Sequence, residues 1–168
     1  MKTKDLVKYA LFLTLAVVAS YIEHLVPLPF LFPGAKLGLA NSIGLIILYI
    51  YDKKRYIIFG LLRVLLSALL FSGFGTTFMI SLGGNILASL ATILLLYNKK
   101  ISIFGIGVNG AIFHGLGQVI VVSIIYSTIQ MFNYLIMLTI SGIISGLLMA
   151  YISKLVIEKL PKNFINNK

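Results

Sequence analysis

The residues that could bind a ligand are few, and they lie within or beside long apolar runs of the sequence. An ionisable group inside a bilayer costs several kcal/mol unless it faces a cavity or a partner. The cations outnumber the single carboxylate in this set, which favours an anionic or polar ligand. We predict that the substrate-binding residues are Lys36, Asn41, Arg63, Asn85, His114 and Gln118, while the apolar runs also contain Glu23, His24 and Asn109.

The stretch Phe32–Asn41 (FPGAKLGLAN) combines a proline, two glycines, a lysine and an asparagine between two strongly apolar runs. A helix that faces lipid would favour none of these residues, whereas a backbone that bends around a ligand would. Gly34 and Gly38 allow close approach of the backbone, and Lys36 supplies a positive charge. We therefore predict that this stretch forms the mouth of a small-molecule site.

Positions along the predicted helices suggest that these side chains share one pocket. At 1.5 Å of rise per residue, Glu23, Lys36 and Asn41 fall near the outer ends of their helices. His114 and Gln118 are four residues apart and share a helix face. We expect a pocket that opens outward, with Asn85 near the middle of its helix, and with Arg63 and Asn109 deeper, towards the cytoplasm.

Each of these residues also has a purely structural interpretation. Glu23 and His24 could be ordinary residues of the membrane interface, and Lys36 could anchor to outer headgroups. His114 could be a hydrogen-bonded core histidine. Arg63 could extend to the inner headgroups, or pair with backbone carbonyls or with Asn109.

The motifs of several enzyme classes are absent. There is no cysteine and no P-loop. The four acidic residues are far apart in sequence, so no aspartate pair could hold the magnesium of a prenyl diphosphate. Gly105, Gly107 and Gly110 match a dinucleotide fingerprint, but that fingerprint needs a strand before it, and this copy lies inside a bilayer-length apolar run. We expect no catalytic residue, no metal site and no cofactor, and thus no enzyme activity; the four acids are Asp5, Glu23, Asp52 and Glu158.

The composition indicates an all-α membrane protein. Of the 168 residues, 60% are hydrophobic and only 11% are charged, too few charges to cover the surface of a soluble domain. The apolar runs approach the roughly 20 residues that cross a bilayer. The first run lacks a cleavage signal after it, so we expect it to be a retained helix. We predict one integral membrane domain over residues 1–168, a six-helix bundle with helices at about 6–25, 37–51, 56–71, 77–97, 103–126 and 132–153.

The basic residues are distributed in an alternating pattern. Twelve of the 14 Lys and Arg residues lie in the amino terminus, in the turns after the second and fourth helices, and in the tail. The positive-inside rule then places both termini in the cytoplasm of a multi-pass protein of the cell membrane. The net charge of +10 follows from this topology, with some attraction to the lipid bilayer, so we expect no nucleic-acid partner.

Small residues four apart occur on two predicted helices, as Ala16 and Ser20 and as Gly142 and Gly146. This spacing lets helices approach closely in lipid. One explanation of this spacing is packing of helices within the bundle. The other is docking of a membrane partner, for which the first helix is the better candidate.

Four motifs in order resemble the Gx transporter family, often labelled heptaprenyl diphosphate synthase component I. They are Pro33–Asn41, Leu62-Arg63-Val-Leu, Ser81-Leu-Gly83-Gly84 and His114-Gly-Leu-Gly117-Gln118. The resemblance spans about Leu6 to Ser153. This family is similar to the substrate-binding (S) components of energy-coupling-factor transporters, which have six helices and bind a vitamin or precursor near the outer face.

The resemblance implies a function and partners. S components dock on a transmembrane coupling protein driven by two ATPases, and the matching docking residues would be Ala16, Ala19 and Ser20. We expect a substrate-binding importer subunit that captures a small molecule, such as a vitamin or an isoprenoid or quinone precursor. The alternative is a non-catalytic membrane accessory subunit of a polyprenyl (heptaprenyl) diphosphate synthase. A stand-alone secondary transporter is a weaker third hypothesis.

Overall fold

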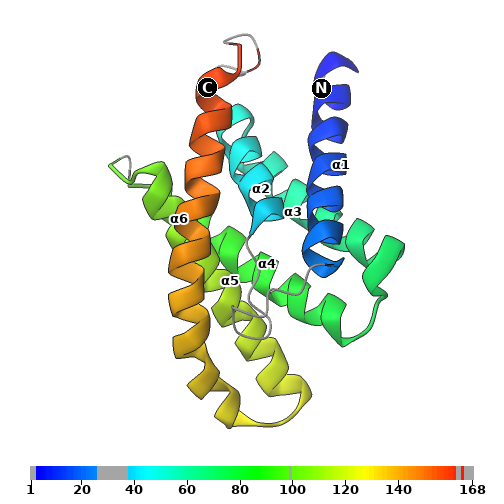
Figure 1. Cartoon of the computed structure of the whole chain (residues 1–168), viewed down its shortest axis with the longest axis vertical. Coiled ribbons are helices and arrows are strands. Elements are labelled where there is room, and N and C mark those ends of the chain that lie inside the picture. Colours follow the sequence, from blue (N-terminus) through cyan, green and yellow to red (C-terminus); the bar gives the residue numbers. More distant parts are fainter. Residues whose placement is uncertain (1–2, 26–37, 99, 162–163, 165–168) are drawn as a thin grey trace.

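The computed structural model describes residues 3–25, 38–98, 100–161 and 164. In these residues the secondary structure is helical and contains no strand, which confirms the all-α prediction. The elements are shown in Figure 1, and their bounds are α1 Thr3–Leu25, α2 Leu39–Ile50, α3 Lys53–Ser67, the π-helix η1 Ala68–Ser72, α4 Thr76–Leu95, α5 Ile103–Ile125, the 3-10 helix η2 Ile129–Tyr134 and α6 Leu135–Lys159.

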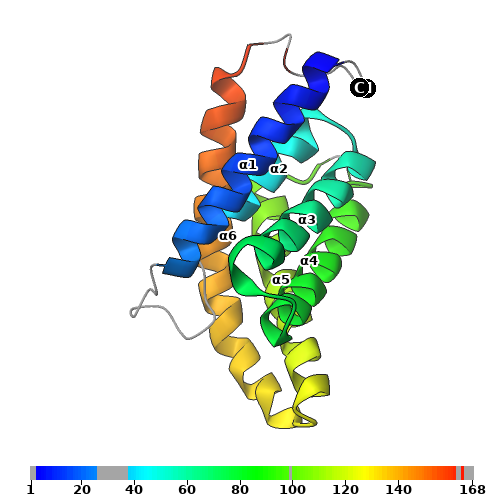
Figure 2. The same cartoon turned by 90° about the vertical axis from the view of Figure 1, so that its right-hand side faces the viewer.

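Helices α1 and α6 place both ends of the described chain at the same end of the bundle (Figures 1 and 2). The α2–α3 and α4–α5 connections lie towards that end, while the α3–α4 and α5–α6 connections lie towards the opposite end. The charged turns are therefore gathered on one side of the molecule. This is the arrangement that the alternation of basic residues predicted.

Five segments of the described chain are long and apolar enough to cross a membrane, which fits a multi-pass protein. Helix α2 is the exception, because its 12 residues span about 18 Å against a hydrocarbon core of about 30 Å. The sequence predicted a longer helix over 37–51. Gly38 precedes α2 with a φ of +79°, a left-handed conformation that cannot continue a right-handed helix. The largest difference between a predicted and an observed helix end is in α6, which continues to Lys159 rather than ending at 153.

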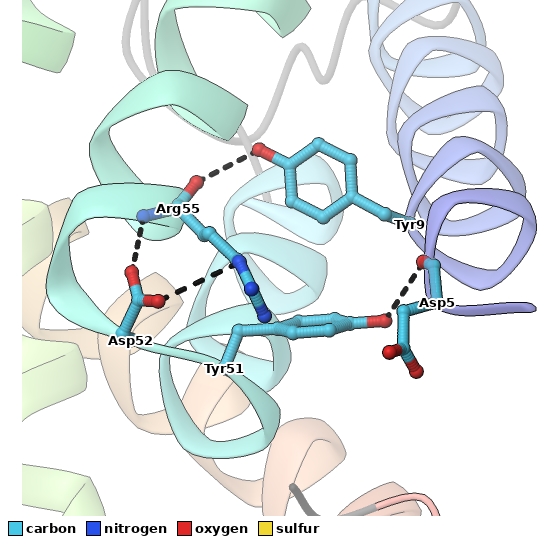
Figure 3. Close-up of polar contacts among 5 residues, drawn as sticks. All are labelled: Asp5, Tyr9, Tyr51, Asp52 and Arg55. Atoms are coloured by element: carbon cyan, nitrogen blue, oxygen red, sulfur yellow. Dashed lines mark hydrogen bonds and ion pairs between the residues drawn. The ribbon is translucent and has the colours of Figure 1, made fainter. Parts of the chain in front are cut away.

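The contact between α1 and the α2–α3 turn is fixed by two tyrosines (Figure 3). The Tyr9 hydroxyl donates to the backbone oxygen of Arg55 at 2.8 Å, and the Tyr51 hydroxyl donates to the backbone oxygen of Asp5 at 3.2 Å. Asp52 caps α3 by accepting from the Arg55 N–H at 2.7 Å. Burial raises the pKa of Tyr51 above its ordinary value, and the nearby Asp5 carboxylate acts in the same direction.

Glycines let α5 pack closely against its two neighbours. A Cβ added at Gly107 would lie 2.8 Å from the backbone oxygen of Gly146 and 2.8 Å from the Ala150 Cβ, both on α6. On the other side, a Cβ at Gly84 of α4 would lie 2.9 Å from the backbone oxygen of His114. Gly142 and Gly146 are both buried. The packing interpretation of these two α6 glycines is therefore confirmed.

Candidate functional site

Polar side chains from four helices meet in a cavity that we name the inner cavity, because it is the nearer of two to the end holding both termini. Asn41 of α2, Arg63 of α3, Asn85 of α4 and His114 of α5 line it, together with apolar and small residues. Its volume is about 40 Å³. Four residues predicted to share a pocket are thus found around one cavity.

A second space, the outer cavity, lies on the side away from the termini. Glu23, Asn41, Arg63, His114 and Gln118 line it, and its volume is about 80 Å³. Three of these residues also border the inner cavity. The two spaces are therefore separate compartments of one polar region. Both spaces are large enough to hold water molecules.

Arg63 occupies the centre of this region. It lines the inner cavity, the outer cavity and a third, lateral cavity of about 50 Å³ between α1, the end of α3 and the start of α4. Among the described residues, no hydrogen bond or ion pair to its guanidinium is present. The Glu23 carboxylate attracts it electrostatically. The expected pair with Asn109 is not formed, because that amide donates to the backbone oxygen of Gly105 at 2.9 Å.

Glu23 holds the start of α2 at the outer cavity. Its Oε1 accepts a hydrogen bond from the Leu39 N–H at 2.7 Å. The first N–H groups of a helix have no partner within the helix, and a carboxylate there is favoured by the helix dipole. Glu23 therefore has a structural role, and it also gives the outer cavity a negative charge.

Two glycines leave the space that the site side chains fill. A Cβ at Gly60 would lie 2.6 Å from Asn85 Oδ1, and one at Gly84 would lie 2.9 Å from His114 Cε1 and 3.0 Å from Gln118 Cγ. Real Cβ atoms do not approach other atoms so closely. The positions of three predicted site residues therefore depend on glycine at 60 and 84.

The other predicted residues have different placements. Lys36 lies outside the described residues, as does most of the Phe32–Asn41 stretch. His24 is exposed and borders only the lateral cavity among the three. Ala16 is fully buried, and Ser20 lines the outer and lateral cavities; docking through these two residues stays a prediction. Docking through the half-buried Ala19 stays a prediction.

Sequence reasoning did not assign the hydroxyl groups near Arg63 to the binding site, although Ser20 was predicted as a docking residue and Ser81 belongs to one of the four motifs. Ser67 and Ser81 line the lateral cavity together with Ser20. Serine is common in membrane helices, where its hydroxyl usually bonds to a backbone carbonyl of its own helix. The residue type therefore carries no signal, and only the orientation of the helices brings these groups together.

The polar side chains around these cavities carry several hydrogen-bond donors. The guanidinium of Arg63 and the amides of Asn41, Asn85 and Gln118 are donor groups of the kind that anion recognition uses. Within the part of the chain that the structure describes, no group of three or more His, Cys, Asp or Glu residues lies together as a metal site would need.

Residues 12–156 match the family model of heptaprenyl diphosphate synthase component I. The chain belongs to this family. The match extends from α1 into α6, so it includes every cavity residue named above. It confirms the label that the four sequence motifs predicted. No curated protein and no solved structure matches the chain.

Proposed function

We propose that the chain is a membrane subunit that binds a small polar or anionic molecule inside its helix bundle, as the substrate-binding component of an energy-coupling-factor-type importer. The observation that carries the proposal is Arg63, which borders three cavities and has no hydrogen-bond or ion-pair partner among the described residues. The captured molecule comes from outside, and ATP is hydrolysed by other subunits.

Energetics supports a ligand for Arg63. A charged side chain at the depth of a membrane helix is costly and usually pairs with a partner or faces water. Asn85 faces the inner cavity and Gln118 the outer one, so both can add hydrogen bonds to whatever the guanidinium attracts. An anionic group placed between them would offset the cost of the buried charge. We assign substrate binding to Lys36, Asn41, Arg63, Asn85, His114 and Gln118.

The topology that accompanies this function has six helices across the cell membrane, with both termini in the cytoplasm and a single membrane domain. The gathering of α1, α6 and the charged turns at one end supports it (Figure 1). Helix α2, with 12 residues, is shorter than the roughly 20 residues that usually cross a bilayer.

A second candidate is a non-catalytic accessory subunit of a polyprenyl diphosphate synthase. The family description favours it more directly than it favours the importer, because it names a component of that synthase. The four acidic residues of the whole chain, far apart in sequence, argue that any synthase activity resides in a partner. In this role the basic end of the bundle would recruit the soluble enzyme.

Co-purification separates the two candidates. The full chain, tagged and expressed in its own host at native level, is extracted in mild detergent, and its partners are identified by mass spectrometry. Recovery of two ATPases and a membrane coupling protein supports the importer, whereas recovery of a prenyl diphosphate synthase supports the accessory subunit. An unrelated six-helix protein with the same tag is the control, and partners that it also recovers are discounted.

A further inference from the structure

The lateral cavity is unlike the other two because hydroxyl groups dominate its polar wall. Its polar lining includes Arg63, Ser20 and Ser67. Its ring-bearing lining includes His24, Phe71 and Phe78. The hydroxyls of Ser20 and Ser67 are buried and have no hydrogen-bond partner. One other described hydroxyl shares this property, that of Ser123, which borders none of the three cavities.

Most comparable hydroxyls in this protein are satisfied by their own helix. Thr14 donates to the backbone oxygen of Ala10, Thr139 to that of Leu135, and Ser153 to that of Met149, all at 3.0 Å or less. A buried hydroxyl without a partner costs free energy. Two such groups belong to residues that line one small cavity beside an arginine.

The chemistry of this wall selects an oxyanion. The guanidinium has five N–H donors and no acceptor, and serine hydroxyls can turn to donate. No carboxylate lines the cavity among the described residues. Arginine with additional donors is the usual arrangement around phosphate and carboxylate groups.

The π-helix η1 shapes the opposite wall. The Ser72 hydroxyl donates to the backbone oxygen of Ser67 at 3.3 Å, and the Gly73 N–H donates to that of Ala68 at 2.9 Å, which closes the wide turn. The Phe71 ring packs against Tyr21 and His24 of α1, with ring centroids 5.3 and 5.5 Å apart. Such π turns are often found at functional sites.

The surroundings of the cavity are apolar. Figure 2 shows η1 between α1 and α4, and the η1 residues Leu69 and Leu70 are 68% and 66% exposed. Leu25 and Phe74, at the adjoining ends of α1 and α4, are exposed as well. In a membrane these side chains contact lipid, so a ligand that reaches Arg63 from this side must itself be partly apolar.

We propose that the lateral cavity binds the phosphate or carboxylate head of an anionic amphiphile that arrives from the bilayer between α1 and α4. The head lies against Arg63, Ser20 and Ser67, and the apolar chain passes Phe71 and Phe78 to the lipid. This inference rests on the proposed function, because it names the class of molecule that is bound and the route by which it enters. It differs in the residues that bind the head, because Ser20 and Ser67 do not line the inner cavity.

The test uses the purified full chain in nanodiscs of zwitterionic phospholipid. The probes are dodecyl phosphate, inorganic phosphate and dodecanol at equal ionic strength, and the measurement is the ligand-dependent rise in unfolding temperature. The variants are Ser20→Ala/Ser67→Ala, the matched control Ser123→Ala, and Asn85→Ala for the inner cavity. We expect wild type and Ser123→Ala to bind dodecyl phosphate more tightly than the other two probes. In the double variant the affinity for dodecyl phosphate should fall about tenfold or more, because hydrogen bonds to charged groups are strong.

The outcomes separate the two proposals. Dodecyl phosphate binding that is unchanged in Ser20→Ala/Ser67→Ala but lost in Asn85→Ala overturns the lateral site and leaves the proposed function standing. Inorganic phosphate binding as tightly as dodecyl phosphate overturns the amphiphile and its route. Removing hydroxyls without partners should not destabilise the ligand-free protein, so a folded double variant keeps the test valid. If that variant does not fold, Ser67→Ala alone, compared with Ser123→Ala, decides the same question.

Discussion

Glu23 on α1 and Leu39 at the start of α2 are joined by a hydrogen bond of 2.7 Å from the Leu39 N–H to Glu23 Oε1. The bond fixes the beginning of the short helix α2 beside the outer cavity, immediately after the left-handed Gly38. It connects two of the elements that surround Arg63. The site is therefore held by a charged group that is also part of its electrostatic environment.

Replacing Glu23 tests this connection. Glu23→Ala leaves the Leu39 N–H without its partner, and we expect a loss of about 1–3 kcal/mol in unfolding free energy. Glu23→Gln keeps an acceptor oxygen and should lose less. The measurement is denaturant unfolding in a fixed detergent, and equal losses in the two variants would contradict a hydrogen-bonding role.

Gly60→Ala should displace the Asn85 amide. The added Cβ would lie 2.6 Å from Oδ1 and 2.9 Å from Nδ2, and overpacking of this kind costs about 1–3 kcal/mol. Gly44→Ala is the matched control on the neighbouring helix, because its Cβ would meet Tyr56 Cε2 at an ordinary 3.7 Å. Thermal unfolding of both variants measures the difference, and equal stability would show that Asn85 is not confined at Gly60.

The Tyr9 hydroxyl bond is a third measurable contact. Tyr9→Phe removes the 2.8 Å bond to the backbone oxygen of Arg55 while keeping the ring contacts with Tyr51 and Phe59. We expect a loss of about 1 kcal/mol. Tyr151→Phe, at an exposed position of α6, should change stability by less than about 0.5 kcal/mol. A Tyr9→Phe variant as stable as Tyr151→Phe would contradict the role of this bond.

The absence of cysteine from the sequence makes the proposed topology directly testable. Position 54 is in the first turn of α3, next to the α2–α3 connection at the end that holds both termini, and position 130 is in η2, in the α5–α6 connection at the opposite end. Both positions are exposed. In intact cells, a membrane-impermeant maleimide should label Gln130→Cys but not Lys54→Cys. Labelling of Lys54→Cys alone would place the termini outside.

The sequence predicted the helices, and it singled out several residues that line the cavities, for a physical reason. Polar groups are rare in apolar runs, so Asn41, Asn85, His114 and Gln118 stood out without knowledge of the fold, and their convergence on neighbouring cavities follows from a bundle with few places to bury polarity. Arg63, which was also predicted as a binding residue at a deeper position, borders all three cavities.

What the sequence could not provide is the rotation of each helix. Apolar residues surround these helices on all sides, so periodicity does not indicate which face is buried. For that reason the sequence did not indicate that Ala16 is fully buried, and it did not assign the hydroxyls of Ser20 and Ser67 to a binding site. The shortness of α2 depends on the backbone of Gly38, which residue type alone permits but does not require.

The most direct test of the Arg63-centred site is the stabilisation of wild type and Arg63→Gln by inorganic pyrophosphate and dodecyl phosphate. Among the described residues no hydrogen bond or ion pair to the Arg63 guanidinium is present, so the ligand-free variant should still fold. We predict that wild type gains unfolding temperature with at least one of the two probes and that Arg63→Gln gains none. Equal gains in both proteins, or no gain in wild type with either probe, would contradict the account.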